Sequence, residues 1–201
     1  MAPAVGTAMY TFYHAPGSSS MAVHIALHEV GAPFEGRVIS LLDRDRDPPE
    51  FRTMNPEGKV PTLVIDGRPL TEVAAILYYL ARTYPGASLF PFGDIEAEAQ
   101  VISWMSFIAS TVHPARRQGL DHAQAVYRLA DQRLGPNTWA VGDYSIADIH
   151  LFRLFWRFRG SLGADPTVFP NLCAHYDRMM ERLAVRKTCE VEAALGYNLP
   201  A

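Results

Sequence analysis

Hydrophobic and polar positions follow two different periods in the first third of the chain. An aromatic, β-prone run at 9–14 predicts a strand, and loose alternation over 34–41 predicts a second strand. Between them, apolar residues three and four positions apart predict a helix over 19–31, for which Gly31 is a natural stop. This order is a βαβ unit, so the two strands should be parallel with a right-handed crossover.

A hairpin and a helix are expected next. An apolar run starting at Val60 leads to an Asp66-Gly67 turn, which predicts two antiparallel strands. A helix is expected over 71–86, with Thr71 as its cap. The order βαβ-ββα predicts a thioredoxin-like α/β fold.

The rest of the chain has the pattern of helices only. A segment rich in prolines and small residues precedes it, and we expect helices at 94–118, 121–135, 145–160, 170–184 and 185–194. We therefore expect a thioredoxin-like domain at 9–85, a linker at 86–93 and an all-helical domain at 94–201.

Composition excludes several classes of protein. The 201 residues carry a net charge of −3 without a basic run, so nucleic acid is not an expected partner. Cys173 and Cys189 form neither a CxxC pair nor a metal motif, and no metal is expected. No signal peptide and no membrane span are predicted, which together with the two cysteines favours a cytoplasmic protein.

Three serines lie where the first helix begins. Ser18, Ser19 and Ser20 follow a Pro-Gly pair, and any of them can cap the helix. The same position could instead hold a thiol for chemistry, because a helix N-terminus stabilises a thiolate. The residues alone leave both interpretations open.

Two other segments are suited to binding an extended peptide. Val60-Pro61 opens a strand, and a cis bond there would turn the Val60 backbone outward, although an ordinary edge-strand proline is the alternative. Glu72 and Val73 lie where a strand passes into a helix, a position whose free N–H groups suit a carboxylate. Glu72 could instead only improve the helix dipole.

A polar stripe follows one face of the first helix after the linker. Ser106, Ser110, His113 and Arg117 are spaced by three or four residues, and Pro114 should kink the helix at His113. The stripe could face a cleft between domains or only solvent.

A capping motif opens a later apolar helix. Ser145 and Asp148 fit the S-x-x-[DE] pattern, in which each side chain satisfies an N–H group at the helix start. We expect Asp148 to act in folding.

The ordered set of motifs resembles the cytosolic glutathione transferase family from Tyr10 to about Leu195. "NPEGKVPTLVIDG" is similar to the family's segment around a Val-Pro pair, "LTEVAAILYYLA" to its glutamate-containing helix start, and "SIADI" to its capping box. "APGSSSMAVHIALHE" and "WMSFIASTVH" look most like the bacterial beta class.

The resemblance implies that glutathione is the co-substrate and that its thiolate attacks a small hydrophobic electrophile held by the helical domain. Glutathione-binding residues by resemblance are Lys59, Val60, Pro61, Glu72, Val73 and Ser106. Catalytic candidates are Ser19, Ser18 and His113, with Tyr13 as a weaker one. A homodimer is also implied.

The sequence departs from the beta-class pattern at three places. Ser19 stands at the position of the cysteine, which makes disulfide exchange there unavailable. Val73 replaces a small or hydroxylated residue, and the usual lysine after the second strand has only Arg44 or Arg46 as counterparts. These departures keep open two rivals, namely a non-catalytic glutathione-binding or protein-interaction member of the fold and a glutathione-dependent isomerase or lyase.

Overall fold

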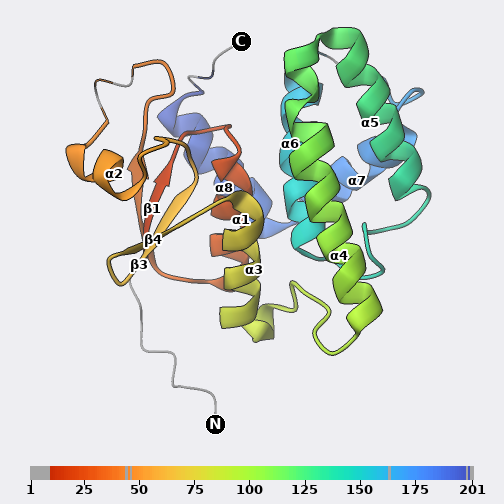
Figure 1. The fold of residues 1–201 in the computed structure, drawn as a ribbon. Coiled ribbons are helices and arrows are strands. Elements are labelled where there is room, and N and C mark those ends of the chain that lie inside the picture. The colour runs from red at the N-terminus through yellow and green to blue at the C-terminus, as the bar shows by residue number, and fades with distance from the viewer. Residues whose placement is uncertain (1–9, 44, 46, 163, 198, 200–201) are drawn as a thin grey trace.

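The computed structural model describes residues 10–43, 45, 47–162, 164–197 and 199. A mixed sheet with its helices forms one part, and a group of longer helices forms the other (Figure 1). The expected thioredoxin-like layout followed by helices is confirmed.

The sheet has four strands in the order β2-β1-β3-β4. The strands are β1 (Tyr10–His14), β2 (Phe34–Val38), β3 (Thr62–Ile65) and β4 (Arg68–Thr71). As expected from the βαβ order, β1 and β2 are parallel, and β3 pairs antiparallel with both β1 and β4. β2 ends at Val38, three residues before the end of the strand expected at 34–41.

Helices cover both faces of this sheet. The helices α1 (Ser20–Val30) and α3 (Val73–Thr83) pack together in the main core, as Figure 1 shows. The short helix α2 (Pro49–Met54) lies in the charged, proline-broken segment, where Phe51 packs with Tyr13 in a separate small cluster.

The remaining helices are α4 (Ile95–Phe107), α5 (Leu120–Leu134), α6 (Ile146–Leu162), α7 (Pro170–Glu181) and α8 (Leu183–Leu195). The helix expected over 94–118 is not continuous. A π-helical turn (Ile108–Val112) and a 3₁₀ segment (His113–Gln118) follow α4. Pro114 explains the change of winding near His113, because it lacks the N–H that an α-helix requires.

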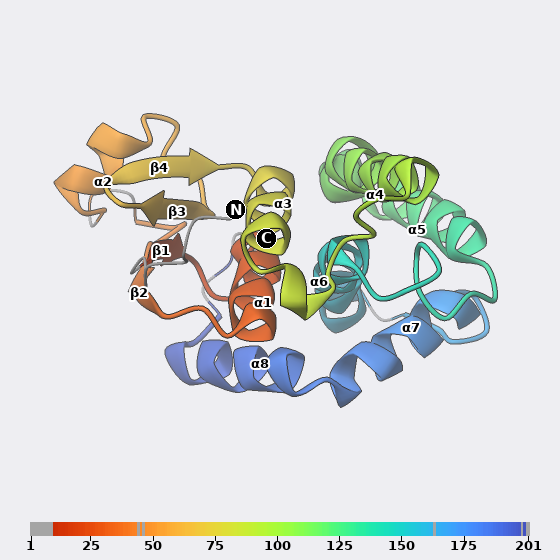
Figure 2. The same ribbon diagram turned by 90° about the horizontal axis from the view of Figure 1, so that it is seen from below.

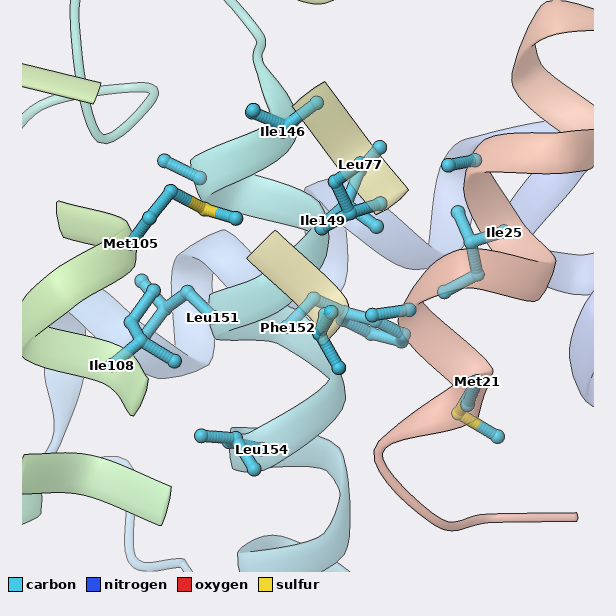
Figure 3. Packing of buried hydrophobic residues seen from close by; sticks show 14 of the residues in the cluster. Met21, Ile25, Leu77, Met105, Ile108, Ile146, Ile149, Leu151, Phe152 and Leu154 are labelled. Carbon is cyan, nitrogen blue, oxygen red and sulfur yellow. The ribbon is translucent and has the colours of Figure 1, made fainter. Parts of the chain in front are cut away.

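One core joins the two parts. Figure 3 shows α6 in the middle, with Ile149 and Phe152 toward α1 and α3 and Leu151 toward Ile108. Both Ile149 and Leu151 are fully buried. The last helix, α8, packs along α1, as Figure 2 shows, so it ties the end of the chain to its beginning.

Helix starts were predicted with mixed success. Ser145 and Asp148 form the expected capping box, because the Ser145 N–H donates to Asp148 Oδ2 (2.9 Å) and the Ala147 N–H donates to Ser145 Oγ (3.2 Å). The expected cap of α3 was wrong. The N-cap is Glu72, and Thr71 is still part of β4.

Candidate functional site

A cavity of about 320 Å³ lies beside the start of α1. It brings together the turn formed by Ser18, Ser19 and Ser20 (the serine turn), the segment before β3, the start of α3 and the 3₁₀ segment after α4. Its lining residues are Ser19, Asn55, Glu57, Lys59, Val60, Pro61, Thr71, Glu72, Val73, Ala74, Ala109, His113, Pro114 and Arg117. We call it the thiol cavity, after the thiol that the resemblance noted in the sequence leads us to expect beside Ser19. Among the catalytic and glutathione-binding candidates named from the sequence, Ser18, Ser106 and the weaker candidate Tyr13 are absent from this lining.

The three serines have different environments. Ser20 Oγ is fully buried, donates to the Ala15 carbonyl (3.0 Å) and accepts from the Ala15 N–H (3.1 Å). Since the Ser20 proton is used there, the 2.7 Å contact between the two hydroxyls has Ser18 donating to Ser20. Ser18 Oγ also accepts from the Ser20 N–H (3.2 Å). Ser18 and Ser20 therefore build the turn.

Ser19 is the serine at the cavity wall. It occupies the N-cap position of α1, but its side chain makes no capping hydrogen bond. Instead Ser19 Oγ donates to the Val60 carbonyl (3.0 Å), so the start of α1 is linked to the segment before β3. A hydroxyl held in this way can rotate its proton toward a ligand atom in the cavity. Capping alone therefore does not account for Ser19.

The segment before β3 forms the part of the cavity wall that adjoins Ser19. The Val60-Pro61 peptide bond is cis, which is one of the two alternatives that the sequence left open. Asn55 Nδ2 donates to the Lys59 carbonyl (2.8 Å) and to Thr62 Oγ1 (2.9 Å), and thereby fixes the loop that presents Val60. The Lys59 ammonium forms an exposed ion pair with Glu57 (2.6 Å).

The third wall is the junction of β4 and α3. Glu72 has a φ of 68°, a conformation that a residue with a Cβ adopts rarely. Such a backbone outlier needs support from its surroundings and is common at ligand sites. Glu72 is exposed, and Val73, the first residue of α3, is buried beneath it. The helix N-terminus faces the cavity with its positive dipole end.

The polar stripe after the linker is divided between two places. His113 and Arg117 line the thiol cavity, whereas Ser106 lines a separate hollow between α3 and α4. Ser110 Oγ donates to the Ser106 carbonyl (2.8 Å) within the helix. The break in winding after Phe107 moves His113 off the line that a straight helix would follow. Only the second half of the stripe therefore reaches the cavity.

His113 lies among positive charges. Partial desolvation in the cavity, together with Arg153, Arg117 and Arg157, lowers its pKa from the ordinary 6.5. The ring is exposed at the rim. At neutral pH His113 is therefore uncharged and offers one donor and one acceptor nitrogen.

Two functional candidates were missed from the sequence. Asn55 belongs to the segment from which the sequence predicted only Lys59, Val60 and Pro61 as binding residues. Arg153 is 2% exposed, and its Nε and Nη2 donate to the carbonyls of Ser18 (2.7 Å) and Gly17 (2.8 Å). The available signal was its spacing of four from Arg157 in a helix whose other residues are mostly apolar.

A group of possible metal ligands lies behind the serine turn. Ligand atoms of His14, His24 and Glu192 are within 4.8 Å of one another, and all three residues are buried. Glu192 Oε1 contacts His24 Nδ1 (2.8 Å), and Oε2 accepts from the Gly17 N–H (2.6 Å). Both carboxylate oxygens are thus engaged in holding α8 against the turn, which is a structural role.

Three other residues considered from the sequence lie away from the cavity or outside the described part of the chain. Tyr13 is buried, and its hydroxyl accepts from Arg37 Nη1 (3.2 Å). Arg44 and Arg46, the counterparts considered for the usual lysine, lie outside the described residues.

Within the described part of the chain, no helix is long and apolar enough to cross a membrane.

Comparison with known proteins agrees with this geometry. The chain matches the glutathione S-transferase N-terminal domain over residues 12–88 and the C-terminal domain over residues 100–182. A bacterial beta-class glutathione S-transferase from Sphingomonas chungbukensis is 33% identical, covers 90% of this chain and 98% of its own, and has a TM-score of 0.78. The chain belongs to the glutathione S-transferase family.

Two further relatives extend the comparison. A sphingomonad glutathione S-transferase complexed with glutathione is 32% identical, with coverage of 91% of this chain and 98% of its own and a TM-score of 0.79. A glutathione S-transferase of Xanthomonas campestris pv. campestris is 28% identical and covers 90% of this chain and 97% of its own.

Proposed function

We propose that this protein is a glutathione transferase that activates the glutathione thiol for attack on a small electrophile. The observation that carries the proposal is the thiol cavity, in which the start of α1, the cis Val60-Pro61 bond and the Glu72–Val73 junction meet. The family match and the solved relative complexed with glutathione support the same activity.

Glutathione would lie along the part of the cavity wall that the thioredoxin-like domain provides. Its γ-glutamyl end would meet Glu72 and the Val73 N–H at the start of α3, which suits a zwitterionic group. Its cysteinyl backbone would pair with Val60, and Lys59 and Pro61 would flank it. Ser106 lines another hollow, so it would not contact glutathione directly.

Ser19 is the proposed activating residue. A thiol has an ordinary pKa of about 8.5, and a hydroxyl donor and a helix N-terminus both lower it. Ser19 sits at that helix start on the cavity wall, whereas Ser18 is buried in the turn and does not line the cavity. His113, neutral on the facing wall, would orient the electrophile or receive a proton.

The wider biological setting is also a proposal. A homodimer is supported by an apolar hollow of about 300 Å³ between α3 and α4, where Tyr78 and Ile102 are exposed. Free thiols at Cys173 and Cys189 are in keeping with the reducing cytoplasm. Detoxification of electrophiles would then be the cellular role.

Binding and turnover test the proposal separately. We expect retention on glutathione resin, elution by millimolar glutathione, and formation of a thioether from chlorodinitrobenzene followed by absorbance. A protein that does not bind millimolar glutathione in calorimetry would rule the proposal out. Binding without turnover of a panel of electrophiles would favour the non-catalytic alternative, and conversion without consumption of glutathione would favour an isomerase.

A further inference from the structure

A second cavity adjoins the thiol cavity on the side of the helical part. It measures about 210 Å³ and is lined by His113, Arg116, Arg117, Tyr127, Arg153, Leu154 and Arg157. We call it the arginine cavity. The two cavities share His113 and Arg117, so a molecule in one lies beside a molecule in the other.

Two elements supply the four arginines. Arg153 and Arg157 are four residues apart and therefore lie on one face of α6. Arg116 and Arg117 come from the 3₁₀ segment that follows the π-helical turn. No carboxylate is among the residues that line this cavity in the described part of the chain.

Arg153 is buried among other positive charges of the arginine cavity. Burial, then Arg157 and Arg116, lower the pKa of Arg153 to about 9, although Tyr127 and Glu192 act in the opposite direction. The two oxygens of Glu192 bind His24 and the Gly17 N–H, so neither makes a hydrogen bond to this guanidinium.

One guanidinium group also has an unmet hydrogen-bonding need. Arg116 Nη1 is buried and has no hydrogen-bond partner among the described residues. A buried donor without an acceptor is costly, and several like charges around one cavity add to that cost. An anion with two oxygens would satisfy both needs, because guanidinium groups bind carboxylates through paired N–H donors.

We propose that the electrophilic substrate carries a carboxylate, which the arginine cavity binds while the reactive carbon faces the thiol cavity. This inference rests on the proposed function and refines the expected class of a small hydrophobic electrophile. Arg153 links the two cavities, because it also donates to the carbonyls of Gly17 and Ser18, just before Ser19. The carboxylate is thus anchored to the same turn that holds the thiol.

A pair of probes isolates the carboxylate. Chloronitrobenzoate and its methyl ester differ in charge but undergo the same reaction, in which the glutathione thiolate forms a C–S bond to the ring and the C–Cl bond breaks to release chloride. We expect the wild type to have a higher kcat/KM for the acid than for the ester, after each is divided by its uncatalysed rate. Arg116→Met should lower that acid-to-ester ratio about tenfold or more.

The matched control is Arg128→Met, since Arg128 is an exposed arginine on α5 outside both cavities. It should keep the wild-type ratio. Arg157→Met is a second cavity variant in case Arg116→Met does not fold, as judged by thermal melting. A ratio near that of the wild type in both cavity variants would overturn the inference.

Two further readouts separate the possible failures. If Arg116→Met instead raises the KM for glutathione and slows both probes equally, the cavity holds a carboxylate of glutathione and the inference is wrong. Calorimetry with nitrobenzoate and nitrobenzamide works without turnover. Tighter binding of the acid, lost in Arg116→Met, would support the carboxylate site even if conjugation, and with it the proposed function, failed; equal binding of acid and amide would contradict the inference.

Discussion

The first half of α6 buries polar groups in two opposite ways, one near Asp148 and the other near Arg153. At the start of the helix, Asp148 is fully buried and accepts hydrogen bonds from the N–H groups of Ala140 (2.8 Å) and Ser145 (2.9 Å), and its Oδ1 contacts His175 Nε2 (3.0 Å). Two residues further on, His150 is also buried, but its Nδ1 has no partner among the described residues. Arg153 follows and adds to the arginine cavity.

This difference in hydrogen-bond partners distinguishes polar groups that serve folding from polar groups that serve binding. The partners of Asp148 all come from the chain itself, so this network fixes the entry to α6 and needs no ligand. The positive groups around Arg153 repel one another, and Arg116 Nη1 and His150 Nδ1 have no hydrogen-bond partner among the described residues. Polar groups of the first kind should affect stability when changed, and polar groups of the second kind should affect substrate choice.

The largest expected effect is at Asp148. Asp148→Asn replaces an acceptor oxygen with a donor beside the N–H groups that it serves, so we expect a loss of about 3 kcal/mol in the free energy of unfolding. Urea denaturation followed by circular dichroism measures it. Asp143→Asn, at an exposed acid just before the helix, is the control and should change stability little. Equal losses in the two variants would contradict the contrast between the ends of α6.

The second prediction concerns acid stability and His150. Burial, His113 and Arg153 lower its pKa from 6.5 to about 3. The folded protein therefore keeps His150 neutral while the unfolded chain binds a proton, so stability falls as the pH drops from about 6.5 toward 3. By pH 5 this loss is about 2 kcal/mol.

His150→Leu should remove that part of the acid sensitivity. The measurement is the urea midpoint at pH 7 and at pH 5, and the variant should lose less stability between them than the wild type does. His122→Asn changes an exposed histidine on α5 and should behave as the wild type. The same drop in midpoint for His150→Leu and the wild type would show that the histidine is protonated in the folded state.

The smallest expected effect separates two neighbouring serines. Ser19→Ala should raise the pKa of bound glutathione by about one unit, because one hydrogen bond to the thiolate is lost, and conjugation near pH 7 should fall about tenfold. The thiolate absorbance of the complex against pH measures the shift. Ser20→Ala removes the partner of the Ala15 backbone and should lower stability while leaving the thiol pKa in place. An unshifted thiol pKa in Ser19→Ala would remove Ser19 from its role.

Much of the fold could be predicted from local patterns. The β-prone run near Tyr10, the apolar run from Val60 and the helical spacing from Val23 to Val30 depend on neighbours in the sequence, and the strands and the helix formed where those patterns placed them. The Ser145–Asp148 box is equally local, since both partners lie within one helical turn. The cap of α3 was misplaced because pairing with β3 keeps Thr71 in a strand.

The candidate site was predicted only in part. Motif positions brought Ser19, Val60 and Glu72 to the cavity, but the spacing of the polar stripe wrongly grouped Ser106 with His113, because the π-helical turn between them changes the winding. The choice among Ser18, Ser19 and Ser20 depended on which hydroxyl lines the cavity and which ones are bound within the turn, and the sequence shows neither.

By itself, the sequence determined the order of strands and helices and the family, because those follow from periodicity and short motifs. Tertiary structure decided which serine faces the cavity and that Arg116, Arg153 and Arg157 meet at one cavity. The physical reason is distance along the chain. Residues more than 30 positions apart, on elements with no shared local pattern, are brought together only by the packing of α6 against its neighbours.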